Sequence, residues 1–437
     1  MKKIDTTPFD TKRVPPKQNV FFMPFLWLAC WFVTRSGKLK IKKVNMKGLK
    51  PPYLVLGTHH AFMDFYVTPL ALFPHRANYV SELEGFEAYG EWLYRQIGCL
   101  GTRKFISDVD LVKNIQRVMK RKGILVLYPE ARYANVGTSS ELPTSVGKLI
   151  KLLKVPVVVI NMQGNYLQSP IWNLAKRKGV KLNTTISQVL TPEQIMEMSV
   201  SDINNVVTEN LKYDEYKYQL DNHIKISYKE RAKGLHLPLY QCPVCEKEFS
   251  MVSEGISLSC SQCKAKWEMD ELGKLVKVDG NNGGPDFSHI PDWYEWERKQ
   301  VEKQIDAGTY HLDCLVKIEA LPNAVNFIDC GKGRLRHEKE GFYLTFYDYR
   351  KEEETTMFFS SKSLFSIHTE YDYRSKKGQC VTLSTREDTY FIYPLEEGFN
   401  ATKIQFATEY LHKFVPKKRK PISYREEEIP DCGCIYG

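Results

Sequence analysis

The sequence lacks an apolar run long enough to cross a membrane as a helix. Its run richest in Trp and Phe, residues 20–33, holds fourteen residues without a charge. As a helix this run would reach about 21 Å at about 1.5 Å per residue, whereas the hydrocarbon core of a bilayer is about 30 Å thick. We therefore do not expect this segment to span a membrane.

The beginning of the sequence also does not have the pattern of a removable signal peptide. A polar leader of 19 residues precedes the apolar run, and no small-residue cleavage site follows it. The chain has 11 cysteines, an odd number. These features argue against a secreted, disulfide-stapled protein and favour reduced thiols inside the cell.

Acidic residues are scarce at the start of the chain. Residues 1–50 carry 12 Lys or Arg against two Asp, an excess of +10 that equals the net charge of the whole sequence. The remainder is balanced, with 50 basic and 50 acidic residues. A basic segment of this kind suits nucleic acid or an anionic membrane, and the residues around it decide between them.

Those neighbouring residues favour a membrane surface. Trp27 and Trp31 prefer the headgroup region of a bilayer. Four lysines can reach anionic lipid, at about 1 kcal/mol per charge near the surface: Lys38, Lys40, Lys42 and Lys43. We predict that residues 1–45 form a monotopic anchor on the cytoplasmic face of a membrane, with anionic lipid as partner. A buried helix of the protein's own core is the alternative.

The chain is long for a single core at 437 residues, so two or three domains are expected. Apolar strands alternate with helices up to residue 235, which predicts an α/β domain with a largely parallel sheet over residues 46–235. The predicted strands are 53–58, 123–128 and 155–160, and the predicted helices are 108–122 and 146–154. Residues 235–239 contain a proline and are predicted to be a linker.

The main chemical clue is a His and an Asp five positions apart. His59 closes the strand at 53–58, and Asp64 falls in the first turn of the next helix. A carboxylate there can fold back onto one ring nitrogen and leave the other free to take a proton from a hydroxyl. Positions i and i+5 of a helix point about 140° apart, so the pair requires His59 to lie outside the helix. His60 has ordinary helical spacing to Asp64, and a surface pair between those two is the alternative.

Three further blocks accompany this pair in order. They are Gly101-Thr102-Arg103-Lys104-Phe105-Ile106, the strand-like Gly123 to Tyr128 ending in Pro129-Glu130-Ala131-Arg132, and the apolar run that Val155 and Pro156 open. In order and spacing the four blocks resemble the phospholipid/glycerol acyltransferase family, which includes the lysophosphatidate acyltransferases. The resemblance covers about residues 20 to 210.

The resemblance implies roles for particular residues. It places the base on His59, oriented by Asp64, because the family's first block is a His, four residues and an Asp. It makes Arg103, Lys104 and Arg132 candidates for binding the phosphate of an acceptor. Glu130 would hold the Arg or its loop in place. Ordinary solvated charge is the alternative for Arg103 and Lys104.

Two blocks depart from the family pattern. Ser107 stands about where the second block has an Arg. The family's third block reads Phe-Pro-Glu-Gly-Thr-Arg, and here Ala131-Arg132-Tyr133 follow Glu130, so the arginine comes one residue early. These departures affect the positions that bind the acceptor phosphate.

Four cysteines form a second motif. Cys242 and Cys245 make one Cys-x-x-Cys knuckle, and Cys260 and Cys263 make another fourteen residues later. Four thiolates satisfy tetrahedral zinc with no position left for water, so residues 240–275 are predicted to be a structural zinc ribbon with short strands at 247–249 and 266–268. Disulfides or a redox pair are the alternatives. Acidic residues around the ribbon argue against a nucleic-acid surface.

Beyond a Gly-rich break at residues 280–284, the sequence pattern becomes mainly that of β-strands. A helix is predicted at 292–306, then about seven alternating strands, then a closing helix at 400–414. This order of elements resembles the pleckstrin-homology and GRAM-like class, predicted here over residues 285–415. Such domains bind lipids or partners, and a regulatory module without a ligand is the alternative. Residues 416–437 are predicted to be a basic tail.

Together these features predict a membrane-associated O-acyltransferase of phospholipid biosynthesis. The resemblance implies acyl-coenzyme A, acyl-carrier protein or an acyl phosphate as donor and a lysophospholipid such as 1-acyl-glycerol-3-phosphate as acceptor, with zinc as the structural cofactor. The alternative is a catalytically inactive acyltransferase-like scaffold that binds lipids and partners at the membrane.

Overall fold

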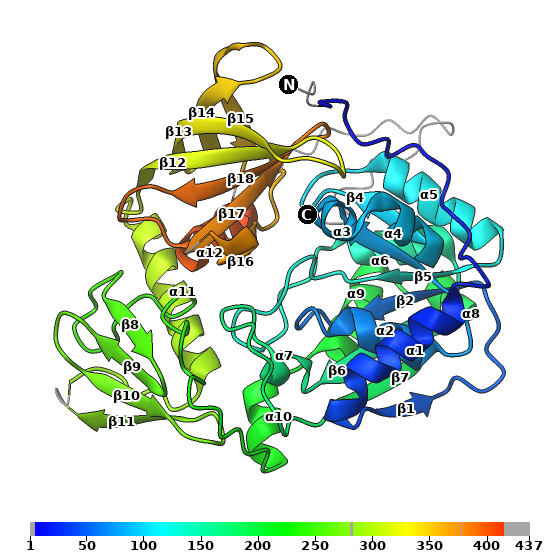
Figure 1. The fold of residues 1–437 in the computed structure, drawn as a ribbon, viewed down its shortest axis with the longest axis horizontal. Helices are drawn as coiled ribbons and strands as arrows, with labels where there is room; N and C mark the ends of the chain where they lie inside the picture. Colours follow the sequence, from blue (N-terminus) through cyan, green and yellow to red (C-terminus); the bar gives the residue numbers. More distant parts are fainter. Residues whose placement is uncertain (1–4, 280–282, 377, 415–437) are drawn as a thin grey trace.

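A seven-stranded mixed sheet forms the centre of the first part of the chain (Figure 1). The computed structural model describes residues 5–279, 283–376 and 378–414. The strand order is β1-β7-β6-β2-β5-β3-β4. The strands are β1 (Lys40–Val44), β2 (Tyr53–Gly57), β3 (Asn78–Glu82), β4 (Cys99–Thr102), β5 (Ile124–Leu127), β6 (Val157–Gln163) and β7 (Asn183–Leu190). Five of them, β6, β2, β5, β3 and β4, are mutually parallel, and β7 runs antiparallel to β6.

Helices cover both faces of this sheet. They are α1 (Met23–Thr34), α2 (Asp64–Leu72), α3 (Leu83–Tyr89), α4 (Glu91–Ile97), α5 (Val109–Lys120), α6 (Ser145–Leu153), α7 (Asn165–Gln168), α8 (Pro192–Glu197), α9 (Val200–Leu211) and α10 (Glu215–Asp221). All five residues of β2 are buried, as a central strand covered on both sides requires. Leu54 and Leu56 pack into the core with α5 and α6, whereas Val55 packs into the opposite core with α2. The predicted α/β layer structure is thereby confirmed.

The predicted anchor region contributes to this domain. Residues 40–44 form β1, which pairs in parallel with β7. Helix α1 packs along α2 and buries Met23, Cys30 and Thr34, while much of its remaining apolar surface faces outward. Among the described residues, no helix combines the length and the apolar character needed to cross a bilayer.

The segment before α1 runs along the surface and joins distant parts of the chain (Figure 1). Arg121 at the end of α5 donates to the carbonyl of Pro15 over 2.8 Å. Further toward the terminus, the amide of Phe9 donates to the carbonyl of Pro322 over 2.9 Å. This segment therefore links the sheet domain to the C-terminal region.

A small antiparallel sheet follows, in the order β11-β10-β9-β8. Its strands are β8 (Met251–Glu254), β9 (Ser257–Cys260), β10 (Lys266–Met269) and β11 (Leu275–Asp279). The strand predicted at 266–268 is confirmed, but the one predicted at 247–249 is wrong. Glu248 forms an isolated bridge with Gln241 and no strand, and Phe249 has φ of 56°, a turn conformation that strands rarely contain. In the predicted linker at 235–239, Leu235 and Leu239 are fully buried and belong to the hydrophobic core.

The C-terminal region is one antiparallel sheet with two helices. The elements are α11 (Ile290–Asp306), β12 (Leu312–Leu321), β13 (Ile328–Glu338), β14 (Gly341–Asp348), β15 (Glu353–Ser360), β16 (His368–Tyr371), β17 (Gln379–Ser384), β18 (Thr389–Pro394) and α12 (Ala401–Phe414). The sheet order is β15-β14-β13-β12-β18-β17-β16. The predicted succession of a helix, seven strands and a closing helix is confirmed. The predicted basic tail, 416–437, lies outside the described residues.

Candidate functional site

The turn between β2 and α2 brings His59 and Asp64 together. His59 Nδ1 lies 3.2 Å from Asp64 Oδ2, and Asp64 is the first residue of α2. A carboxylate can only accept, so Nδ1 carries the proton and Nε2 is the basic nitrogen. The predicted arrangement, with His59 outside the helix, is the one that the structure has.

Asp64 is completely buried and has little freedom to move. Its Oδ2 also accepts from the amides of His60 and Ala61 over 2.6 and 3.1 Å. Its Oδ1 accepts from Asn165 Nδ2 over 2.7 Å. Sequence reasoning missed Asn165, although its place just after β6, the fourth block, is a position where parallel sheets gather site residues.

Aromatic rings enclose the His59 side chain, leaving His59 only 6% exposed. Tyr128 stacks on the imidazole with ring centroids 4.5 Å apart, and Tyr133 lies at the same distance with a tilt of 44°. Phe65 meets the ring edge-on at 6.0 Å. These contacts fix the plane of the imidazole and shield it from water.

His60 points into a different environment. Its ring packs on Tyr213 at 3.8 Å, and its Nδ1 lies 3.7 Å from Glu215 Oε1. Complete burial lowers the pKa of His60 to about 4, so this ring is neutral near pH 7. The pairing of the His60 ring with Asp64 on a surface is thereby excluded, since only the His60 amide contacts that carboxylate.

Glu130 holds the backbone around the site. It accepts from the amides of His59 and Ser140 over 3.3 and 2.9 Å, and from Tyr213 Oη over 3.1 Å. Burial raises the pKa of Glu130 to about 7. Glu130 thereby connects the His59 backbone to Ser140 and Tyr213.

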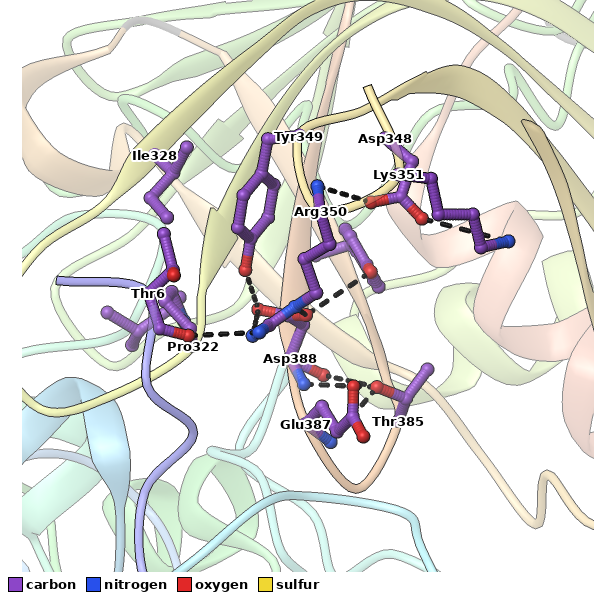
Figure 2. A network of polar contacts seen from close by, with 12 residues as sticks. Thr6, Pro322, Ile328, Asp348, Tyr349, Arg350, Lys351, Thr385, Glu387 and Asp388 are labelled. Carbon is purple, nitrogen blue, oxygen red and sulfur yellow. Dashed lines mark hydrogen bonds and ion pairs between the residues drawn. The ribbon is translucent and has the colours of Figure 1, made fainter. Parts of the chain in front are cut away.

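Arg103 reaches from the sheet domain into the C-terminal region. Its guanidinium donates to the carbonyls of Leu321, Pro322 and Glu387 over 2.6 to 2.8 Å and to Thr389 Oγ1 over 3.0 Å. Figure 2 shows the polar network next to this contact, in which Arg350 pairs with Asp388 over 3.0 Å and donates to the carbonyl of Thr6. Arg103 is 2% exposed, and it joins two domains in this structure.

Lys104 and Arg132 also bind the C-terminal region. Lys104 Nζ pairs with Glu82 and lies 3.0 Å from His368 Nε2 in β16. Arg132 pairs with Glu409 of α12 over 2.6 Å and donates to Ser366. The three cations predicted to hold a phosphate are therefore not gathered around an open site in this structure, because separate parts of the C-terminal domain bind each of them.

An apolar cavity of about 160 Å³ lies between α1, α2, α3 and α4. Its lining includes Leu26, Phe62, Phe65, Tyr89 and Leu93. Phe65 belongs both to this lining and to the ring of aromatics around His59. The cavity is thus separated from the imidazole by a single side chain.

The four predicted metal ligands come together in the ribbon. Cys242, Cys245, Cys260 and Cys263 place their Sγ atoms within 4.8 Å of one another. Two of these S···S distances, Cys242 to Cys263 and Cys245 to Cys260, are 3.7 Å. Tetrahedral zinc with Zn–S of about 2.3 Å requires about 3.8 Å between sulfurs, so the four cysteines could hold a metal ion.

Comparisons with known proteins give distant structural likeness alone. No protein-family profile and no curated protein sequence matches the chain. Among solved structures it is similar to the crystal structure of the 1-acyl-sn-glycerophosphate (LPA) acyltransferase PlsC from Thermotoga maritima, with a TM-score of 0.37 and 13% identity, covering 44% of this chain and 77% of that chain. A likeness of this size does not place the chain in a family.

Proposed function

We propose that this chain is an O-acyltransferase of the membrane surface. It moves a fatty acyl group from a thioester donor to the hydroxyl of a lysophospholipid such as 1-acyl-glycerol-3-phosphate, in phospholipid biosynthesis. The observation that carries the proposal is the pair of His59 and Asp64, 3.2 Å apart, with the carboxylate buried and fixed by three further donors. The four sequence blocks that resemble phospholipid/glycerol acyltransferases agree with it.

The proposed chemistry uses His59 as a general base. Nε2 takes the proton of the acceptor hydroxyl while its oxygen attacks the thioester carbonyl, and Asp64 stabilises the imidazolium that forms. When the tetrahedral intermediate collapses, the C–S bond breaks and the thiolate leaves with the proton from Nε2. General-base catalysis of this kind typically contributes about 10²–10⁴-fold to the rate.

The apolar cavity next to Phe65 is the proposed site of the acyl chain. It is lined mainly by aromatic and aliphatic side chains, which suits a fatty acyl group. Because Phe65 separates it from His59, a chain bound there would end near the imidazole.

The outer face of α1 supports attachment to a membrane. Phe25, Leu28, Trp31 and Phe32 are 55 to 70% exposed along this helix. Four exposed lysines lie in the residues that follow it: Lys38, Lys40, Lys42 and Lys43. An apolar face beside a row of cations fits a monotopic or peripheral helix on anionic lipid.

The remaining parts have supporting roles in this proposal. The four cysteines of the ribbon hold zinc, and a closed Cys₄ shell makes that zinc structural. The C-terminal sheet domain acts as a lipid- or partner-binding module of the pleckstrin-homology type. The donor is acyl-coenzyme A or acyl-carrier protein, and nucleic acid is not a partner.

Lipid mass spectrometry of the purified protein tests the proposal. The protein is incubated with lysophosphatidate, a lysophospholipid without a phosphomonoester, or a glycolipid, each with acyl-coenzyme A and with acyl-carrier protein. A new diacyl product that is absent with the His59→Ala variant supports the proposal. No product from any combination would contradict it.

The second candidate is a catalytically inactive scaffold. It is favoured by one observation, the engagement of Arg103, Lys104 and Arg132 with the C-terminal domain. A scaffold would bind vesicles and lysophosphatidate without turnover, so binding measured beside the mass spectrometry separates the two functions.

A further inference from the structure

The loop after β5 covers the candidate base. We call residues 130–141 the cover loop. Tyr133 in this loop packs on the His59 ring at 4.5 Å, and the amide of Ala134 donates to the His59 carbonyl over 3.1 Å. His59 is left 6% exposed. A substrate that reaches the imidazole from this side must displace Tyr133.

Helix α12 holds the cover loop on both sides of Tyr133. Before it, Arg132 Nη1 donates to Glu409 Oε1 over 2.6 Å. After it, Asn135 Nδ2 donates to Gln405 Oε1 over 2.8 Å. Gln405 and Glu409 are one helical turn apart, so they lie on the same face of α12. The position of α12 therefore sets the position of Tyr133.

The Glu409 carboxylate binds two guanidinium groups. Its Oε2 accepts from Arg298 over 2.5 Å, while its Oε1 binds Arg132 and Ser366. Burial would raise the pKa of Glu409, but the charges of Arg132 and Arg298 outweigh it and lower the pKa to about 2. A cavity of about 250 Å³ adjoins this cluster, and Ser140, Lys413 and the carboxylates of Glu141 and Glu295 also line it. An anion in the cavity would meet the same two arginines that the carboxylate binds.

We propose that α12 is a latch that a phosphomonoester opens. Glu409 binds Arg132 in the closed state and keeps Tyr133 over His59. A phosphomonoester carries more charge and more acceptor oxygens than a carboxylate, so it can compete for Arg132 and Arg298 and release the cover loop. The proposal rests on the proposed function in taking His59 as the base and a phosphorylated lipid as the acceptor.

The closed state is tested by the reactivity of His59 toward diethyl pyrocarbonate, measured by peptide mass spectrometry on the full chain without ligand. Glu409→Gln removes the charge at nearly constant shape, and we expect His59 to react about threefold faster or more. Gln405→Ala, which frees the other side of Tyr133, should act in the same direction. The matched control is Asp306→Asn, since Asp306 joins α11 to Tyr410 of α12 over 2.8 Å without touching the cover loop. Its His59 should react as in the unaltered chain.

The opening ligand is tested by hydrogen exchange of peptides that span the cover loop. Exchange in the unaltered chain should rise with lysophosphatidate, and less so or not at all with lysophosphatidylcholine. If glycerol 3-phosphate or inorganic phosphate acts as well as lysophosphatidate, the phosphate alone opens the latch. If only lysophosphatidate acts, the acyl chain is required too. Both results support competition for the arginines.

Two results would overturn the latch. One is unchanged His59 reactivity in Glu409→Gln and Gln405→Ala variants that melt within a few degrees of the unaltered chain. The other is cover-loop exchange that no phosphomonoester alters. Acyl transfer is measured separately, so a loop that opens in a chain without transferase activity would refute the proposed function and leave the latch standing.

Discussion

At the residue scale, the candidate site is a histidine whose carboxylate partner is held in one position. Asp64 receives hydrogen bonds from His59, His60 and Ala61 of the β2–α2 turn and from Asn165, the first residue of α7. A fixed carboxylate keeps the proton on Nδ1 and the basic nitrogen free. The rate of transfer should therefore depend on residues that never touch substrate.

Two substitutions around Asp64 should slow acyl transfer by different amounts. Asp64→Asn should lower kcat about a hundredfold or more, because an amide no longer fixes the His59 tautomer or stabilises its charge. Asn165→Ala should lower kcat about tenfold, because Asp64 Oδ1 loses its donor and the carboxylate can turn. Asn161→Ala is the control, since Asn161 lies in β6, four positions before Asn165, and donates to the carbonyls of Asn210 and Lys212. Equal rates in Asn165→Ala and the unaltered chain would contradict the positioning role of Asn165.

Local spacing predicted that Asp64 could pair with His59, because both residues belong to one turn, and the resemblance to the acyltransferase blocks then favoured His59 over His60 as the base. The partners of the predicted phosphate-binding residues could not be predicted in this way. Arg103 binds a carbonyl 218 positions away, and Arg132 binds Glu409, 277 positions away. A motif indicates which cations lie near the end of a strand, but it does not reveal which hydrogen-bond acceptors of a later domain bind them.

At the element scale, the predicted helices and strands mostly agree with the observed ones because their signals are local. The helix predicted at 292–306 is observed as α11, Ile290–Asp306, where apolar residues recur at helical spacing. The strand predicted at 247–249 failed because the knuckle turns impose positive φ at Glu246 and Phe249. Neither residue type signals such a conformation in a sequence.

Glu215, the first residue of α10, should make the free energy of unfolding fall as the pH rises. Glu215 is buried, and burial raises its pKa to about 8. Its unfolded pKa is about 4.3, so the folded state holds the proton more tightly, and stability is lost between about pH 4 and pH 8 by at most about 1.4 kcal/mol per pH unit. Glu215→Gln should flatten this part of the profile, as measured by denaturant unfolding across that range. An unchanged slope in the variant would show that Glu215 titrates normally.

The ribbon should depend on its metal. The protein should carry a single zinc ion per chain by elemental analysis, and Cys245→Ala should lose it, because three thiolates hold zinc more weakly than four. We expect the variant to melt about 5 °C lower or more. Cys330→Ala is the control, since Cys330 is buried in the C-terminal sheet away from the cluster. Protein without zinc, or with disulfides among the four cysteines, would contradict the zinc ribbon.

At the scale of the whole molecule, one face should bind anionic membranes through α1. Phe25, Leu28 and Phe32 are 70%, 61% and 57% exposed, so replacing all three by Gln should leave the fold intact. Binding to phosphatidylglycerol-containing vesicles should weaken about tenfold or more, because the apolar area that enters the bilayer is lost. High salt should weaken binding less, since it screens the lysines only.

The control for the membrane face lies on the C-terminal sheet. Tyr347 and Phe358 are 52% and 51% exposed, and their replacement by Gln should leave vesicle binding unchanged. Vesicle binding that survives the α1 substitutions, or that depends on Tyr347 and Phe358, would move the membrane face to another part of the molecule.

The measurement that tests the central claim most directly compares turnover of a labelled acyl thioester with lysophosphatidate by the unaltered protein, His59→Gln and His60→Gln. The chain is expected to form phosphatidate, and His59→Gln should lose about 10²–10⁴-fold in rate, because the base is gone. His60→Gln should retain most of the activity, since its ring is buried against Tyr213 and Glu215, away from the Asp64 carboxylate. A folded His59→Gln variant that works at the full rate, or a His60→Gln variant that alone is inactive, would contradict the assignment of His59 as the base.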